Sequence, residues 1–238
     1  MRKTTVHQVT QLSFLPRLFP VNVYLVEEDD GLTLIDAGMP FSLKGILKAA
    51  QSLSKPITRI VLTHAHGDHV GALDGLKEAL PGAKVYISRR DQALLAGSRA
   101  LEEGEPQLPI KGDVPKKIRT KPDHLIHDGD RIGYLLAIAS PGHTPGHMAF
   151  LDTRSQVLIA GDAFQVRGGM AVSGHMQPLF PFPAMATWNK GAALASARRL
   201  ADLRPSWLAV GHGRMLEQPQ AALTLAIQHA EAAFGKEA

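Results

Sequence analysis

Apolar and polar residues alternate along the chain in a way that predicts short strands interleaved with amphipathic helices. Branched apolar residues predict strands over 21–26 and 32–35, and the sequence Glu-Glu-Asp-Asp-Gly between them is a turn signal, so we expect a β-hairpin. Apolar positions recur at helical spacing over 41–53 and 70–80. The compact apolar run over 57–62, which lies between those two segments, predicts a buried strand.

The rest of the chain continues this alternation. We predict a strand over 84–87, a short helix over 89–96, strands near 133–139, 147–152, 157–160 and 207–210, and helices near 188–202 and 219–233. In both halves strands come first and helices follow around a further strand, an order that a sandwich of two sheets with outer helices would produce. We therefore predict an α/β (α+β) fold with four αββα layers, and one domain over 1–238.

Two segments interrupt the alternation. Glycines, prolines and mixed charges over 97–121 predict an insertion or a partly ordered loop. The segment 163–187 is apolar yet rich in glycine and proline, so we expect it to form the wall of a substrate pocket, with a packed loop or a contact between two subunits of a homodimer as alternatives. The candidate pocket residues are Met170, His175, Phe180 and Phe182.

Composition excludes several classes of protein. The chain has no cysteine, which excludes disulfides, a thiolate nucleophile and a metal site built on sulfur. The net charge of +4 is spread along the chain and aromatic residues are few, so we expect no nucleic-acid partner. Because no apolar run reaches the length of a membrane span or a signal peptide, we expect no membrane association and a cytoplasmic protein.

Histidines carry the clearest chemical signal. His64, His66, Asp68 and His69 stand within six residues, directly after the strand predicted over 57–62. On a helix, positions two apart do not face the same way, whereas a loop can bring these side chains together. Imidazole and carboxylate groups suit zinc, iron or manganese. The cluster therefore predicts a metal site at a strand end.

Three more candidate ligands follow the same design of an apolar strand, a glycine and a polar side chain. His143 lies in the sequence Ser-Pro-Gly-His-Thr-Pro-Gly-His, Asp162 follows the strand near 157–160, and His212 follows the strand near 207–210. Loops at strand ends of α/β sheets are the places where sites form. We expect His7, His124, His127 and His229 to be ordinary surface or packed residues, and Arg167 to be solvated rather than bound to an anionic substrate.

The series His64-x-His66-x-Asp68-His69, His143, Asp162 and His212 resembles the metallo-β-lactamase superfamily, and the resemblance extends from Asp36 to His212. It implies an αββα sandwich with a dinuclear metal site at one edge. His64, His66 and His143 would hold the first metal, and Asp68, His69 and His212 the second. Asp162 would bridge the two metals, and Asp36 and His147 would support the ligands without binding metal.

The resemblance also implies the reaction class. Two divalent ions, with zinc expected ahead of iron, manganese or cobalt, would activate a bridging hydroxide and stabilise a developing oxyanion. The catalytic residue we name is Asp68, which could orient the nucleophile or shuttle its proton. The expected enzyme is a lactonase-like hydrolase or esterase that cleaves an ester, lactone or thioester of a small molecule with an apolar portion, with phosphotriesters as side substrates.

Departures from known branches leave other functions open. The family's known lactonases place a tyrosine after the bridging aspartate, but 163–187 contains none. Glyoxalase II enzymes bind glutathione through a basic C-terminal region, whereas only Arg214 and Lys236 follow His212 here. The alternatives are a phosphodiesterase or nuclease acting on an anionic substrate, a mononuclear iron sulfur dioxygenase, and a non-catalytic metal-binding module. The natural substrate, the metal in the cell and the oligomeric state are left open.

Overall fold

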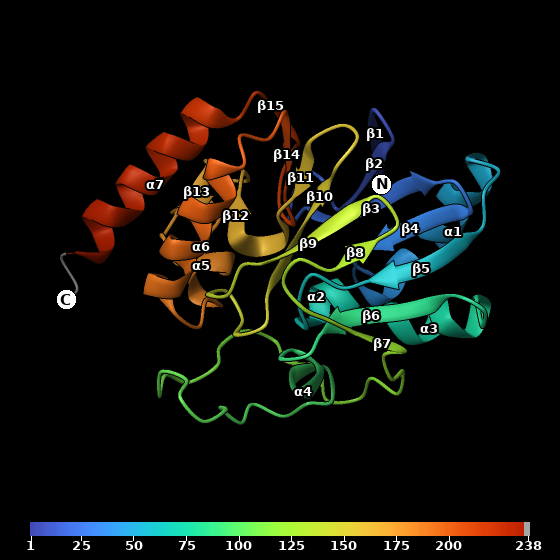
Figure 1. Cartoon of the computed structure of the whole chain (residues 1–238), viewed down its shortest axis with the longest axis horizontal. Coiled ribbons are helices and arrows are strands. Elements are labelled where there is room, and N and C mark those ends of the chain that lie inside the picture. Colours follow the sequence, from blue (N-terminus) through green and yellow to red (C-terminus); the bar gives the residue numbers. More distant parts are fainter. Residues whose placement is uncertain (236–238) are drawn as a thin grey trace.

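A computed structural model describes residues 1–235, in which two β-sheets face one another and helices cover their outer faces (Figure 1). The first sheet has seven strands that lie side by side in chain order. They are β1 (Arg2–Val6), β2 (Val9–Phe14), β3 (Val21–Glu28), β4 (Gly31–Ile35), β5 (Ile57–Val61), β6 (Lys84–Ser88) and β7 (His124–Ile126). The first four pair antiparallel and the last four pair parallel, so the chain must cross back over the sheet between the parallel strands.

The second sheet has six strands. Their spatial order is β15 (Leu216–Glu217), β14 (Trp207–Ala209), β11 (Val157–Ile159), β10 (Met148–Asp152), β9 (Leu135–Ala139) and β8 (Arg131–Ile132). Strands β11 and β14 are parallel, and β9 runs in the same direction because it is two antiparallel pairings away from β11. The carboxyl ends of these three strands therefore meet at one edge. A separate ribbon pairs β12 (Phe164–Gln165) with β13 (Ala171–Val172).

Helices form the two outer layers. In Figure 1, α1 and α3 lie outside the first sheet, and α6 and α7 lie outside the second. The helical segments are η1 (Pro40–Ser42), α1 (Leu43–Ser52), α2 (Gly67–Val70), α3 (Leu73–Ala79), α4 (Gln92–Leu95), η2 (Gly161–Ala163), α5 (Phe182–Met185), α6 (Lys190–Asp202) and α7 (Gln220–Phe234). The predicted four-layer αββα sandwich is confirmed.

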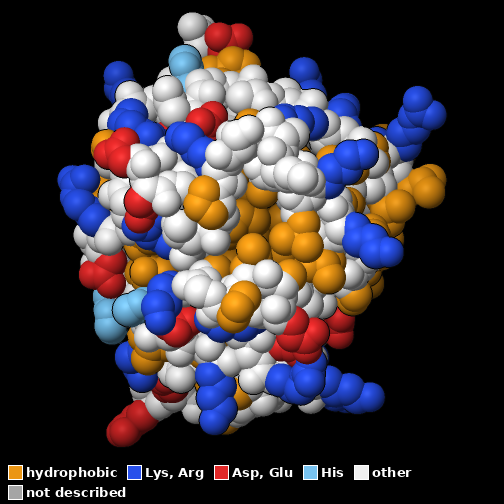
Figure 2. All heavy atoms as spheres, turned by 90° about the vertical axis from the view of Figure 1, so that its right-hand side faces the viewer, with side chains coloured by type: hydrophobic (Ala, Val, Ile, Leu, Met, Phe, Trp, Pro, Cys, Tyr) orange, Lys and Arg blue, Asp and Glu red, His pale blue; other side chains and the backbone are white. Residues whose placement is uncertain are grey.

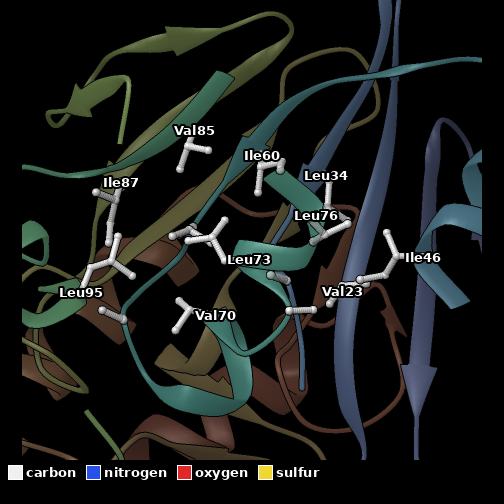
Figure 3. Packing of buried hydrophobic residues seen from close by; sticks show 14 of the residues in the cluster. Val23, Leu34, Ile46, Ile60, Val70, Leu73, Leu76, Val85, Ile87 and Leu95 are labelled. Carbon is white, nitrogen blue, oxygen red and sulfur yellow. The ribbon is translucent and has the colours of Figure 1, made fainter. Parts of the chain in front are cut away.

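Apolar side chains fill the three spaces between the layers. Between the first sheet and its helices, Leu34 and Ile60 pack against Ile46, Leu73 and other fully buried residues (Figure 3). A second cluster fills the space between the sheets and a third lies under α6 and α7. Figure 2 views the face on which α1 and α3 lie, where hydrophobic side chains gather in the centre and Lys and Arg side chains surround them. The burial of apolar side chains in the three clusters is the main favourable contribution to folding.

The structure adds strands that the sequence pattern did not predict. β1 and β2 form a hairpin from residues that are rich in threonine, glutamine and serine. All six side chains of β2 are buried, including Thr10, Gln11 and Ser13, so polarity hides a strand that lies inside the sheet. The helix predicted over 70–80 is α3, which begins at Leu73, and a separate short helix, α2, precedes it and ends at Val70.

The segment 97–121, predicted to be an insertion or a loop, has neither helix nor strand, and several side-chain contacts connect it to the rest of the fold. The Arg99 guanidinium donates to the carbonyl groups of Ile110 and Gly112 at 2.6 and 2.8 Å. The Trp188 indole N–H donates to the Leu108 carbonyl at 2.9 Å. These bonds fix a stretch of backbone against the metal-ligand candidates. Within residues 1–235, no helix is both long and apolar enough to cross a membrane.

Candidate metal centre

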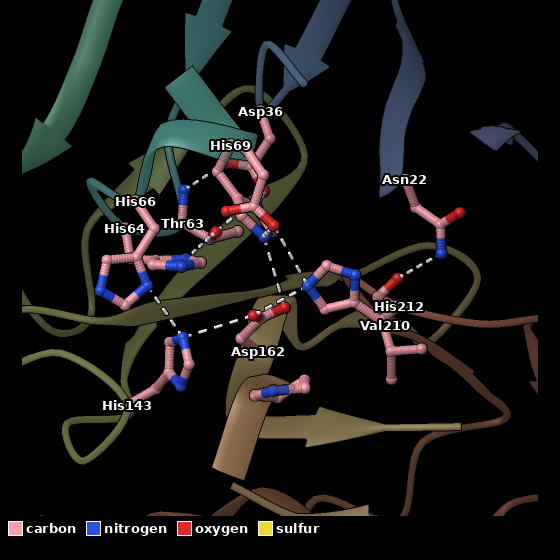
Figure 4. A network of polar contacts seen from close by, with 12 residues as sticks. Asn22, Asp36, Thr63, His64, His66, His69, His143, Asp162, Val210 and His212 are labelled. Carbon is pink, nitrogen blue, oxygen red and sulfur yellow. Dashed lines mark hydrogen bonds and ion pairs between the residues drawn. The ribbon is translucent and has the colours of Figure 1, made fainter. Parts of the chain in front are cut away.

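Four loops that follow strands bring all seven predicted ligands to one edge of the sandwich. Figure 4 shows six of them, His64, His66, His69, His143, Asp162 and His212. The loop after β5 carries the cluster from His64 to His69. The loops after β9, β11 and β14 carry His143, Asp162 and His212, and the carboxyl ends of these strands lie together. Because β9, β11 and β14 run in the same direction, the three short motifs that follow them lie at one site although they are distant in sequence.

His64, His66 and His143 form the first group of candidate ligands. One ligand atom from each lies within 4.8 Å of the others, and His66 Nδ1 stands 3.0 Å from His143 Nε2. All three side chains are buried, and His64 Nε2 has no hydrogen-bond partner. Burial lowers the pKa of all three, that of His64 and His143 well below the ordinary value. They are therefore neutral imidazoles, the form that binds metal.

A second group, Asp68, His69 and His212, lies beside the first, and Asp162 stands between them. Asp162 Oδ2 is 3.3 Å from His143 Nε2 and 3.2 Å from His212 Nε2. Its other oxygen is 3.5 Å from His69 Nε2. One carboxylate therefore reaches side chains of both groups, as a bridging ligand must.

The carboxylates of the second group make a positive charge on the neighbouring imidazoles favourable. Burial raises the pKa of Asp162, but His212 and His69 outweigh that effect and hold it well below the ordinary value. Burial lowers the pKa of His69, but the carboxylates, Asp162 first among them, outweigh it and raise the pKa well above the ordinary value. In the protein without metal, a proton on the His69 imidazole therefore balances the carboxylates. A bound cation could take over that role.

Unpartnered buried atoms provide a test of whether metal ions fit this site. His64 Nε2 is buried without a hydrogen-bond partner, and His69 Nε2 and Asp162 Oδ1 are buried with only ion-pair contacts at 3.5 Å or longer. Such atoms are costly unless something else binds them. A side chain at Gly211 would collide with Asp162 Oδ1, so glycine keeps this carboxylate accessible to the centre. The cluster of imidazole and carboxylate groups is thus suited to binding metal ions.

Hydrogen bonds to the outer ring nitrogens orient the imidazoles. His66 Nε2 lies 3.0 Å from the Lys111 carbonyl and His212 Nδ1 lies 2.7 Å from the Pro20 carbonyl. A carbonyl only accepts, so each of these nitrogens carries the proton and leaves the opposite nitrogen free for metal. His143 Nδ1 contacts the hydroxyl of Ser173 at 2.9 Å.

Asp36 and His147, predicted to support the ligands, both contact the centre indirectly. Asp36 accepts hydrogen bonds from the backbone N–H and the hydroxyl of Thr63, and one of its oxygens lies 2.8 Å from His69 Nδ1. His147 Nε2 accepts the backbone N–H of Asp162 at 3.0 Å. Burial lowers the pKa of His147 to about 3, so it stays neutral and can accept this bond.

Asp91, which sequence reasoning missed, connects the two histidine loops. Its carboxylate accepts the backbone N–H of Ala65 at 3.2 Å, the hydroxyl of Thr144 at 2.7 Å and the backbone N–H of Gly146 at 2.8 Å. The side chain is fully buried, and burial raises its pKa to about 6. No local pattern distinguishes Asp91 from a surface aspartate, because its partners are distant in sequence.

A cavity of about 590 Å³ opens onto the candidate ligands. Its apolar wall comes from three separated segments and comprises Phe19, Met39, Pro40, Phe182, Pro183, Met185 and Ala186. Sequence reasoning missed Phe19 and Met39, and also Asp113, whose carboxylate lies against Gly67 at the cavity. The only available signal was the glycine and proline content of the neighbouring loops.

The four residues predicted to line the substrate pocket lie in different parts of the structure. Phe182 lines the cavity. Phe180 is buried behind it, with its ring 5.4 Å from that of His212. Met170 packs against the apolar cluster under α6 and α7, and His175 lines a different hollow, so these three positions are corrected. The ribbon β12–β13 and the helix α5 explain this, since they turn successive parts of 163–187 to different sides.

Comparison with known proteins gives matches over most of the chain. The family described as "Metallo-beta-lactamase superfamily" matches residues 16–212. The uncharacterized protein YobT of Bacillus subtilis (strain 168) is 59% identical over 231 residues, which cover 97% of this chain and 99% of that protein. The probable metallo-hydrolase YflN of the same strain is 33% identical, covering 81% of this chain and 80% of that protein.

Among solved structures, the crystal structure of TTHA1623 in a di-iron-bound form has a TM-score of 0.64 and is 31% identical in sequence. The match covers 89% of this chain and 96% of that one. The family match over residues 16–212 includes the four loops that carry the candidate ligands.

Proposed function

The chain belongs to the metallo-β-lactamase superfamily and is a metal-dependent hydrolase, and we propose that it uses two divalent metal ions to cleave an ester, lactone or thioester of a small molecule with an apolar portion. The observation that carries this proposal is the position of the His and Asp cluster, which lies at the inner end of an apolar cavity. A cavity of this kind binds the apolar part of a ligand and leaves a few polar groups to act on it.

We assign His64, His66 and His143 to one ion and Asp68, His69 and His212 to the other, with Asp162 shared. The grouping of their ligand atoms within 4.8 Å supports this assignment. Nitrogen and oxygen donors without sulfur suit zinc, iron and manganese alike. We propose zinc, and the di-iron form of TTHA1623 makes iron the second candidate.

Bound divalent ions would supply an activated water and a Lewis acid. The chain's own residues would do the rest. Asp68 is the exposed carboxylate of the cluster, with 22% of its side chain accessible against 3% for Asp162. It can therefore exchange a proton with a molecule in the cavity, and its Oδ2 lies 3.4 Å from His212 Nε2. Phe19 and Phe182 line the cavity beside the cluster and would contact the apolar portion of the substrate.

We expect purified protein to contain about two divalent ions per chain and to lose hydrolytic activity when a chelator removes them. The measurement is metal analysis together with a panel of homoserine lactones, aryl esters, thioesters, phosphotriesters and phosphodiesters, before and after chelation. Activity should return when zinc or iron is added back. One iron per chain with oxygen consumption and no hydrolysis would instead indicate an oxygenase, and binding of metal without turnover would indicate a non-catalytic module.

The charge of the cavity predicts its preference among substrates. None of the described residues that line it is Lys or Arg, whereas Asp113 adds a carboxylate beside the cluster. A substrate with its own carboxylate would therefore meet no cationic side chain, so we propose a neutral substrate. This separates the proposal from the alternative of a phosphodiesterase or nuclease, whose binding would weaken steeply with salt.

Replacing Asp113 with Asn should improve the use of anionic substrates. Removing one carboxylate a few ångströms from the bound molecule removes about 1 kcal/mol of repulsion, which is about a fivefold change. We therefore expect kcat/KM for a carboxylate-bearing ester to rise about fivefold relative to its neutral methyl-ester counterpart. Steady-state kinetics of both esters measures this ratio, and Asp202→Asn, an exposed position at the end of α6, is the control. An unchanged ratio in Asp113→Asn would contradict a role for this charge.

A further inference from the structure

A second hollow, of about 220 Å³, adjoins the backbone of the loop that carries His212. Three arginines line it: Arg2 from β1, Arg167 from the turn between β12 and β13, and Arg214 from the segment after β14. We call it the arginine hollow. Its remaining described lining residues are proline, valine and glycine, so it contains no acidic side chain. It shares no lining residue with the cavity above the candidate metal ligands.

Backbone contacts hold two of the arginines side by side. The backbone N–H groups of Val166 and Arg167 both donate to the His212 carbonyl at 3.0 Å. Gly213 has a φ of +128°, and a Cβ there would lie 2.7 Å from the Arg167 nitrogen, so only glycine lets these segments approach. Arg214 follows directly. The fold therefore sets the backbone positions of Arg167 and Arg214 beside each other.

Within the described chain, none of the three arginines has the carboxylate partner that several other arginines have. Arg59, Arg90 and Arg199, among others, form ion pairs with nearby carboxylates. Within residues 1–235, no carboxylate forms an ion pair with any arginine of the hollow. Arg167 donates to the Arg17 carbonyl at 2.5 Å, which fixes its direction but leaves its charge uncompensated. Three arginines therefore bring positive charge to one hollow, and this charge would attract an anion.

We propose that the arginine hollow binds a phosphate-type dianion, either free inorganic phosphate or the phosphoryl group of a small metabolite. A guanidinium group presents a planar fork of N–H donors that matches the oxygens of phosphate. Three such forks provide more donors and more charge than one carboxylate can use, which favours phosphate. The site is separate from the hydrolytic centre, and its occupant contacts the segments that hold the His212 backbone.

Calorimetric titration of inorganic phosphate into the metal-loaded protein at low salt tests this proposal. Because phosphate also binds divalent ions, the double variant Arg167→Gln/Arg214→Gln isolates the contribution of the hollow. We expect wild-type protein to bind one phosphate more than the double variant, or to bind it at least about tenfold more tightly. Glycerol 3-phosphate distinguishes the sources: a site for free phosphate binds it weakly, whereas a site for a phosphoryl group binds both.

Two further variants keep the result interpretable. Arg214→Gln alone changes only an exposed side chain, and it should weaken phosphate binding while near-ultraviolet circular dichroism shows a native fold. Arg131→Gln/Arg204→Gln removes the same charge from arginines that likewise form no ion pair within the described chain but lie elsewhere, and it should bind phosphate as wild type does. Equal phosphate binding by wild-type protein and the Arg167→Gln/Arg214→Gln variant would overturn the proposal, as would an equal loss in the control pair.

Discussion

Replacing Asp162 with Asn is expected to lower kcat/KM for the preferred substrate by at least about 10³-fold, which corresponds to about 4 kcal/mol. Asn has nearly the same shape, so the loss comes from the charge. The Asp162 carboxylate lies within 3.5 Å of ring nitrogens on His69, His143 and His212. An amide at this position would leave one fewer negative charge among the candidate ligands, and it would present N–H groups where a metal requires an oxygen.

Metal analysis and kinetics together check this prediction. The Asp162→Asn variant should retain at most about one ion per chain, because the remaining imidazoles hold one site better than two. Asp202→Asn, which removes a carboxylate from the exposed end of α6, is the matched control and should keep both the ions and the activity. Full metal content with wild-type kcat/KM in Asp162→Asn would show that this carboxylate does not hold the catalytic metals.

Replacing Asp91 with Ala is expected to lower the free energy of unfolding by about 3–5 kcal/mol, since several buried donors would lose their acceptor at once. Asp91 accepts from Ala65, Thr144 and Gly146, and its side chain is fully buried. Ala65 separates His64 from His66, and the other two partners flank His143. The loops that carry three candidate ligands would therefore lose their common attachment, and metal affinity should fall together with stability.

Urea unfolding of metal-free and metal-loaded protein measures both effects. The difference between wild type and Asp91→Ala should be larger for the metal-loaded protein, because binding to the native state adds to stability. Asp91→Asn should be milder, since an amide oxygen can still accept two of the three hydrogen bonds. Asp202→Ala is the control and should stay within about 0.5 kcal/mol of wild type. A similarly small change in Asp91→Ala would mean that the loops hold their positions without it.

The candidate ligands were predictable from sequence because each of them lies next to a local pattern. Each of the four loops follows an apolar strand, and a glycine directly precedes His143, Asp162 and His212, whereas the glycine of the His64 loop, Gly67, comes after the first two ligands. The strands that place them were predictable for the same reason, since β5, β11 and β14 are compact apolar runs. Polar strands do not show this pattern, and β2 was missed because it buries the polar side chains of Thr10, Gln11 and Ser13, of which Thr10 and Gln11 form hydrogen bonds to other side chains.

The four-layer architecture and the chemistry of the cluster could be predicted because strand ends and ligand types are local properties of the chain. The surroundings of that cluster depend on how distant segments pack together. Segments far away in sequence form the surroundings of Asp91, Asp113 and the three arginines of the hollow. The residues adjacent to them in sequence do not predict these surroundings. A cavity wall or a charged hollow is a property of packing between elements, so its residues can be identified only once the elements are in place.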